Sequence, residues 1–324
     1  MKKDYTYAVA RIRARETQLL SSQVLEQLMA AGTYEDVLRL LADKGWGYSD
    51  DELTADAMLT AETQKTWDLI SELTDDMSTF DVFCISDDYH NLKAAIKLAY
   101  TKHNIEPDRL FLPGGNIDPE IIKRAAQDRD YSKLPEAMAV TAKEAQDTLL
   151  HTGDGQLCDI MIDRAALEAI YAAGKKAEHE VLAQYAELTV AASDIKIAVR
   201  CGKTGKPYDF ILRALADCDE LDTQALARAA MNGTDSICEY LQKTCYSAAA
   251  AALKKSPAAF ECWCDDLIIE SIKPQKYNPF TAGPLAAYIL ARLNEIKCVR
   301  LILSGKQNGL PDEVIRERLR EMYV

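Results

Sequence analysis

The sequence has little glycine and proline, with 14 glycines and 10 prolines in 324 residues. It also lacks long segments in which Val, Ile, Thr and Tyr alternate with polar residues, the pattern typical of half-buried strands. Alanine, leucine and long charged side chains are abundant instead, and these residues favour helix. We therefore expect an all-α fold with a sizeable core, since 48% of the residues are hydrophobic.

Long apolar runs are also missing, and none approaches the roughly 18 residues that a membrane-spanning helix needs. The first residues lack the apolar core of a secretory signal peptide. The sequence thus predicts a cytosolic protein without direct membrane insertion. If the protein acts at a membrane, we expect another protein to hold it there.

Positive charge is in short supply. The chain has 38 basic and 51 acidic side chains, which give a net charge of −13 at pH 7. Such a surface repels polyphosphates and anionic lipids. Nucleic acid is therefore excluded as an expected partner.

Motifs of common catalytic and cofactor sites are absent as well. The nine cysteines include no Cys-x-x-Cys pair, and the four histidines have no partner at metal-ligand spacing. Residues 200–207 resemble a phosphate-binding loop only in part, because Pro207 stands where that loop needs Ser or Thr. We interpret this segment as a basic turn between helices. The sequence predicts no catalytic residue, no cofactor and no metal ligand.

The clearest helical pattern lies near the C-terminus. Apolar residues spaced by three or four positions share one face of a helix, which Gly283 and Pro284 begin and Gly305 ends as a C-terminal cap. We interpret this face as core rather than as an exposed groove for a partner. Its residues are Leu285, Ile289, Leu293, Ile296, Val299 and Leu303.

Proline and charge predict two more helix starts. Asp118 before Pro119 is typical of an acidic N-cap followed by proline at the first helical position. Pro311 is predicted to begin a helix with an acidic first turn. Arg318 and Arg320 are predicted to lie in its last turn, where basic residues suit the helix dipole.

Two sequence elements recur three times in the same order, about a hundred residues apart. The first covers residues 30–38, 125–134 and 229–237, and the second covers residues 91–97, 194–200 and 295–300. We therefore predict three similar helical repeat units, spanning residues 1–105, 106–206 and 207–324. Three such units can stack in a line or close around a pseudo-threefold axis, and the closed arrangement leaves a hollow suited to a shaft.

The second element places a lysine at one position in each repeat unit: Lys93, Lys196 and Lys297. We hypothesise that these three lysines face a common axis and bind a partner. The alternative is that they close salt bridges inside their own units. Polar residues precede them by two positions, but residues i and i+2 of a helix point apart and cannot pair. These preceding residues are Asn91, Asp194 and Glu295.

Several blocks of the sequence also resemble those of a known family. They cover residues 5–14, 34–43, 45–47, 88–93, 295–303 and 305–311. In sequence and in order, these blocks are similar to those of the C subunits of the V-type and A-type rotary ATPases, the counterparts of the d subunit of the eukaryotic vacuolar enzyme. The last two blocks are the most specific. Cys298 departs from the family pattern, which predicts a polar residue such as Asn.

The resemblance implies an all-helical, funnel-shaped protein of three similar units that binds no nucleotide. Such a protein sits on the cytoplasmic end of the membrane proteolipid rotor ring, one copy per complex. It receives the tip of the central stalk, made of the D and F subunits. It would be a non-catalytic adaptor that couples ATP hydrolysis or synthesis to transport of H⁺ or Na⁺, the choice of ion lying in other subunits.

Two other functions are compatible with the residues alone. One is a helical scaffold that binds other proteins outside a rotary ATPase. The other is an enzyme with an unfamiliar helical active site. Binding to stalk or ring subunits separates the adaptor from the scaffold, and nucleotide turnover by the isolated chain would support the enzyme.

Overall fold

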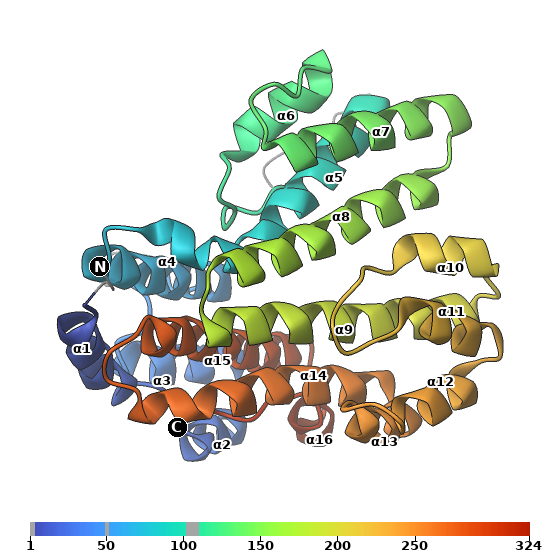
Figure 1. The fold of residues 1–324 in the computed structure, drawn as a ribbon. Helices are drawn as coiled ribbons and strands as arrows, with labels where there is room; N and C mark the ends of the chain where they lie inside the picture. The colour runs from blue at the N-terminus through green and yellow to red at the C-terminus, as the bar shows by residue number, and fades with distance from the viewer. Residues whose placement is uncertain (1–3, 49–51, 102–109) are drawn as a thin grey trace. The chain divides into compact units, whose positions relative to one another are not determined.

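The computed structural model describes residues 4–48, 52–101 and 110–324, and every regular element in these residues is helical (Figure 1). The all-α prediction is confirmed. With α for α-helices and η for 3-10 helices, the elements are α1 (Thr6–Glu16), α2 (Ser22–Ala30), α3 (Tyr34–Asp43), α4 (Ala55–Leu73), η1 (Met77–Phe83), α5 (Ile85–Thr101), α6 (Pro119–Asp128), α7 (Glu136–Thr152), α8 (Gly155–Lys176), α9 (Glu180–Lys203), α10 (Tyr208–Ala214), α11 (Thr223–Met231), α12 (Thr234–Leu241), α13 (Ser247–Lys255), α14 (Pro257–Ile272), η3 (Lys273–Tyr277), α15 (Gly283–Gln307) and α16 (Asp312–Arg316).

The chain forms two compact bodies. The terminal body consists of residues 1–77, 179–181 and 251–324, and the central body consists of residues 78–178 and 182–250. Both ends of the chain therefore belong to the terminal body. The three repeat units are defined by sequence similarity, which this division does not test, and they stay a prediction.

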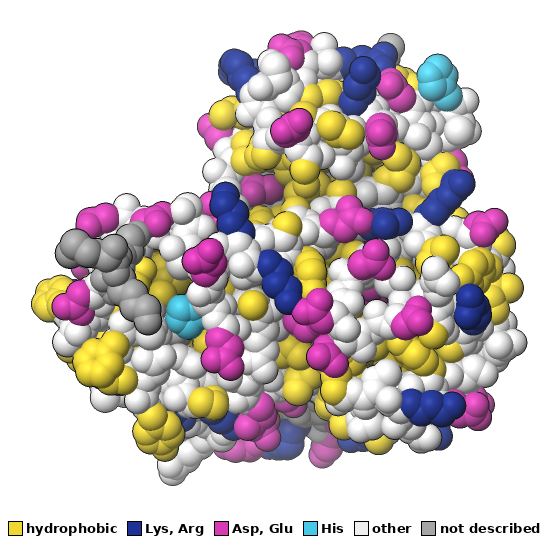
Figure 2. All heavy atoms as spheres, in the orientation of Figure 1, with side chains coloured by type: hydrophobic (Ala, Val, Ile, Leu, Met, Phe, Trp, Pro, Cys, Tyr) yellow, Lys and Arg dark blue, Asp and Glu magenta, His cyan; other side chains and the backbone are white. Residues whose placement is uncertain are grey.

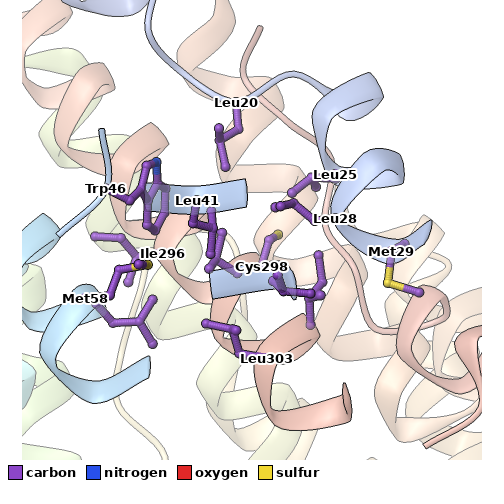
Figure 3. Packing of buried hydrophobic residues seen from close by; sticks show 14 of the residues in the cluster. Leu20, Leu25, Leu28, Met29, Leu41, Trp46, Met58, Ile296, Cys298 and Leu303 are labelled. Carbon is purple, nitrogen blue, oxygen red and sulfur yellow. The ribbon is translucent and has the colours of Figure 1, made fainter. Parts of the chain in front are cut away.

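Helix α15 is the central element of the terminal body. It is buried along most of its length and packs against α1, α2, α3, α4 and α14. Figure 3 shows Ile296 and Leu303 of α15 in one apolar cluster with Leu25 and Leu28 of α2 and Leu41 of α3. The predicted core face of α15 is confirmed, with only Leu293 of its six residues half-buried.

The end of α15 differs from the prediction. Gly305 lies inside the helix, which continues to Gln307, and the left-handed residue that follows is Gly309, with φ of 63°. Gly305 is needed for packing instead of capping, because a Cβ atom there would lie 2.5 Å from Cδ1 of Ile315 on α16. A contact of this kind depends on tertiary structure, which the local pattern does not contain.

The predicted end of the following helix is also wrong. Helix α16 ends at Arg316, so Arg318 and Arg320 lie beyond its last turn. Arg320 donates from Nε to Oδ2 of Asp265 on α14, at 2.8 Å. The arginine is therefore held by an ion pair with another helix and not by the dipole of its own.

In the central body, α5 packs against α6, α7 and α8. Helix α8 also packs against α10, which leads through α11 to α12. The predicted start of α6 is confirmed, since the Asp118 carboxylate accepts a hydrogen bond from the backbone N–H of Glu120, at 2.9 Å. The core of α5–α8 includes Leu92, Ile96, Ile122, Met138, Leu149 and Ile162.

Candidate functional site

Two of the three candidate lysines form ion pairs inside their own body. Nζ of Lys93 on α5 lies 2.5 Å from Oδ1 of Asp163 on α8. Lys297 on α15 pairs with Asp265 on α14. Lys196 on α9 is exposed, and no ion pair joins it to any residue that the structure describes.

These ion pairs match the alternative interpretation of Lys93 and Lys297, but they do not decide what the lysines bind. The pairs are partly exposed, and pairs of this kind contribute about 1 kcal/mol or less to stability. Solvent reaches their ammonium groups, and the Lys196 group is open to it. A role of the three lysines in partner binding stays a prediction.

The polar residues two positions before these lysines have a common place in the structure. Asn91 on α5, Asp194 on α9 and Glu295 on α15 are all buried, with exposed fractions of 0%, 0% and 1%. Each accepts a hydrogen bond from the backbone N–H of a residue that precedes a short helix. The donors are Leu112 for Asn91, Ala216 for Asp194 and Leu20 for Glu295.

Sequence reasoning missed this shared role. The repeat alignment placed the three polar residues at one position, and an acid or amide in an otherwise apolar helix pattern was the available signal. Their partners are backbone amides of other segments, so the side chains alone could not identify them. In the folded protein, each of the three polar side chains holds a connecting segment against a long helix through its hydrogen bond.

A cleft of about 850 Å³ opens in the terminal body. It is lined by the α1–α2 connection, the α3–α4 connection, one side of α4 and the first half of α15. Basic residues Arg15, Lys44 and Lys65 lie beside acidic Asp68 and Glu72. The lining is therefore mixed in charge and favours neither anions nor cations.

Arg292 of α15 lies at the cleft and is 6% exposed. Its guanidinium forms ion pairs with Glu62 of α4 and with Glu295 of its own helix, both of them buried. The guanidinium also lies over the Trp46 ring, with 5.2 Å from its central carbon to the ring centroid. Burial raises the pKa of Glu295, and the charge of Arg292 opposes that shift.

The same carboxylates hold two backbone segments. Glu62 accepts from the backbone N–H of Gly47 at 2.9 Å and from Nζ of Lys65 at 2.7 Å, while Glu295 accepts from Leu20. The network thus joins α15, α4 and two connecting loops. Its charged groups are already paired with one another, and such an arrangement serves to hold structural elements together.

Other candidate motifs have a plain structural place. Residues 200–207 form the end of α9, a turn in which Gly205 has φ of 63°, and Pro207 at the N-cap of α10. Within the described part of the chain, no group of three or more His, Cys, Asp or Glu side chains could hold a metal ion. The same residues contain no helix long and apolar enough to cross a membrane.

The surface is mixed in charge on the face that Figure 2 shows. Basic side chains of the described residues are interspersed there with acidic and uncharged ones and form no extended basic patch. This distribution agrees with the net charge of −13.

Comparison with known proteins places the chain among components of ATP synthases. A family model described as ATP synthase (C/AC39) subunit matches residues 8–318. Because the match covers nearly the whole sequence, the chain belongs to this family, in agreement with the resemblance of its sequence blocks.

Curated relatives align over nearly the full chain. The C subunit of the V-type sodium ATPase of Enterococcus hirae is 21% identical over 319 residues, which cover 96% of this chain and 97% of that protein. The C subunit of the A-type ATP synthase of Methanocaldococcus jannaschii is 24% identical, with 97% and 86% covered. Its counterpart in Methanosarcina mazei is also 24% identical, with 98% and 92% covered.

Proposed function

We propose that this chain is a non-catalytic rotor component of a V/A-type rotary ATPase. It couples the D and F subunits of the central stalk to the membrane proteolipid ring, so that ATP hydrolysis or synthesis is linked to ion transport. The observation that carries the proposal is the family match over residues 8–318. Relatives that are C subunits of such enzymes, aligned over nearly their full length, support it.

The proposed partners also define where the protein acts. It is a peripheral component at the cytoplasmic face of the membrane, present once per complex and held there by the membrane sector of the ATPase. Direct membrane insertion has no part in this proposal, and neither has nucleic acid.

Transfer of torque requires a stiff body rather than a reactive group. In the terminal body, the Arg292 network joins α15 to α4 and to two connecting loops. In the central body, Lys93 and Lys97 of α5 form ion pairs with α8. Close-packed helices that are also held together by such ion pairs and hydrogen bonds are hardly compressible, which supports a mechanical role.

The three repeat units, arranged as a funnel around a hollow for the stalk, are part of the same proposal. The matching hydrogen bonds of Asn91, Asp194 and Glu295 support an internal repeat. So does the burial of one apolar residue near the end of each copy of the first element: Val37, Leu134 and Ile237. Electron microscopy of the isolated chain should resolve three similar lobes, and a single solid globule would contradict the arrangement.

A binding experiment tests the proposed function. The tagged full chain is mixed in parallel with a complex of the D and F subunits and with detergent-solubilised proteolipid ring, and circular dichroism monitors its folding. We expect both partners to be retained. If a folded chain retains neither, the coupling role is wrong and the helical scaffold becomes the better interpretation. Nucleotide turnover by the isolated chain would contradict the non-catalytic part.

A further inference from the structure

Asp194 is the one of the three repeated polar residues whose hydrogen bonding is incomplete. Its Oδ1 atom accepts from the backbone N–H of Ala216 at 3.1 Å. Its Oδ2 atom is buried and has no hydrogen-bond partner among the described residues. Buried polar atoms in folded proteins are rarely left unpaired, because the loss of hydration is costly.

Asn91, at the aligned position of α5, shows how such a site is completed. Its Oδ1 atom accepts from the backbone N–H of Leu112 at 2.7 Å, and its Nδ2 atom donates to the carbonyl oxygen of the same residue at 2.8 Å. The amide thus pairs with both polar groups of one backbone residue. A carboxyl group has the same planar shape, and it offers the same donor–acceptor pair only when one oxygen carries a proton.

The surroundings of Asp194 favour the neutral form. Leu167 of α8, Val190 of α9 and Ala216 form a buried apolar cluster, and Ala216 also donates to Asp194. Of the charged groups that act on the carboxyl, Glu187 of α9 and Asp217 after α10 are acidic. Burial, the main cause, and these acids raise the pKa of Asp194 to about 8.

Two other groups near the carboxyl do not supply the missing partner. Arg164 of α8 acts against the shift, but its Nε atom donates to Glu168 at 2.7 Å. Cys218 is half-buried, and burial likewise raises the pKa of its thiol, to about 12. It therefore adds no charge near neutral pH.

We propose that Asp194 is a proton-binding site, at which the folded chain holds a proton on Oδ2 at neutral pH and donates it to the backbone carbonyl of Ala216, as Asn91 does to Leu112. The proton comes from solvent as the chain folds, and the only new covalent bond is the O–H bond. This arrangement satisfies both carboxyl oxygens of a residue that is 0% exposed.

The proposal predicts how folding depends on pH. An unfolded aspartic acid has a pKa of about 3.9, below that of the folded group. The stabilisation by the proton is therefore fully present below the unfolded value and is lost as pH rises through about 8. Between these limits, Asp194 should weaken the folding equilibrium up to tenfold for each unit of pH.

The test compares the full wild-type chain with two single-residue variants, Asp194→Asn and Asn91→Asp. Asp194→Asn keeps the geometry but cannot ionise, so we expect its advantage over the wild type to grow by about tenfold in the folding equilibrium for each pH unit from 6 towards 8. Asn91→Asp places a carboxyl at the aligned site and should lose stability over the same pH range. Denaturant unfolding measured from pH 5 to 9 gives both results.

The titration of Asp194 can also be measured directly in the wild-type chain. In the wild-type chain with ¹³C-labelled aspartate, the Asp194 carboxyl carbon, assigned by its loss in Asp194→Asn or by through-bond correlation, should titrate near 8. A titration near 4, or an Asp194→Asn chain that is equally destabilised at pH 6 and pH 9, would overturn the proposal.

Discussion

Arg292 is the centre of a buried network of charged groups in the terminal body. It forms ion pairs with two buried carboxylates, lies over an indole ring and connects α15 to α4. Its net contribution does not follow from the count of its contacts, because desolvating three charged groups is itself costly. What the geometry does establish is that Glu295 depends on Arg292, its one cationic partner among the described residues, whereas Glu62 also pairs with Lys65. Removal of Arg292 would therefore leave buried negative charge at Glu295.

We therefore predict that Arg292→Met lowers the free energy of unfolding by about 3–5 kcal/mol, as for other buried ion pairs that lose one partner. The matched control is Arg39→Met on α3, where the arginine is exposed and 3.5 Å from Asp36. That change should cost about 0.5 kcal/mol or less. Urea unfolding of both variants measures the difference. Equal losses of stability would show that the Arg292 network does not hold α15, α4 and the two loops together.

At the scale of the helix, local signals predicted some boundaries and missed others for a physical reason. The start of α6 was predictable because Asp118 caps a backbone N–H two residues away. The role of Gly305 was not, because the group that requires a glycine is Ile315 on another helix.

The same applies to the candidate site. The repeat identified Asn91, Asp194 and Glu295 as equivalent, but their partners are backbone groups of other segments.

Gly174 of α8 provides a prediction at this scale. A Cβ atom there would lie 2.8 Å from the backbone oxygen of Leu182 and would meet Ala186, both on α9. Gly174→Ala gains about 1 kcal/mol of helix propensity, but the overpacking costs about 1–3 kcal/mol. We expect a net loss of stability of up to about 2 kcal/mol, measured by thermal or denaturant unfolding.

The control for this change lies on the same helix. None of the described residues stands within 4 Å of a Cβ atom at Gly155, in the first turn of α8. Gly155→Ala should therefore leave stability unchanged or slightly higher. If Gly174→Ala were equally harmless, the close approach of α8 and α9 would not be a constraint on the fold.

For the whole molecule, the main feature that the sequence did not predict is that its N-terminal and C-terminal segments pack together in one body. Helices α1–α4 pack on α15, more than two hundred residues later, to form the terminal body. A repeat search along the sequence cannot detect this, because similarity gives the period but not the point at which one unit ends. With the predicted bounds, α5 belongs to the first unit but packs against α6, α7 and α8 of the second, and α15 of the third unit packs against α2, α3 and α4 of the first.

The last prediction concerns partner binding and rests on the proposed function. Replacement of Lys93, Lys196 and Lys297 together by Glu should weaken binding of the D and F subunits or of the ring by about tenfold or more, since rim charges act on association. Stability should fall by about 1 kcal/mol or less per position, because the two ion pairs are partly exposed. Binding is measured by titration calorimetry, and stability by denaturant unfolding.

The matched control reverses three exposed lysines outside the repeated position, Lys143, Lys243 and Lys254. Both triple variants change the net charge from −13 by the same amount, so a general electrostatic effect would weaken binding equally in the two. A loss confined to the repeated lysines would assign them to the interface. Unchanged binding with a large loss of stability would instead mean that Lys93 and Lys297 serve only in their ion pairs. A purely structural role would lower the stability of the chain without affecting its affinity for the partner.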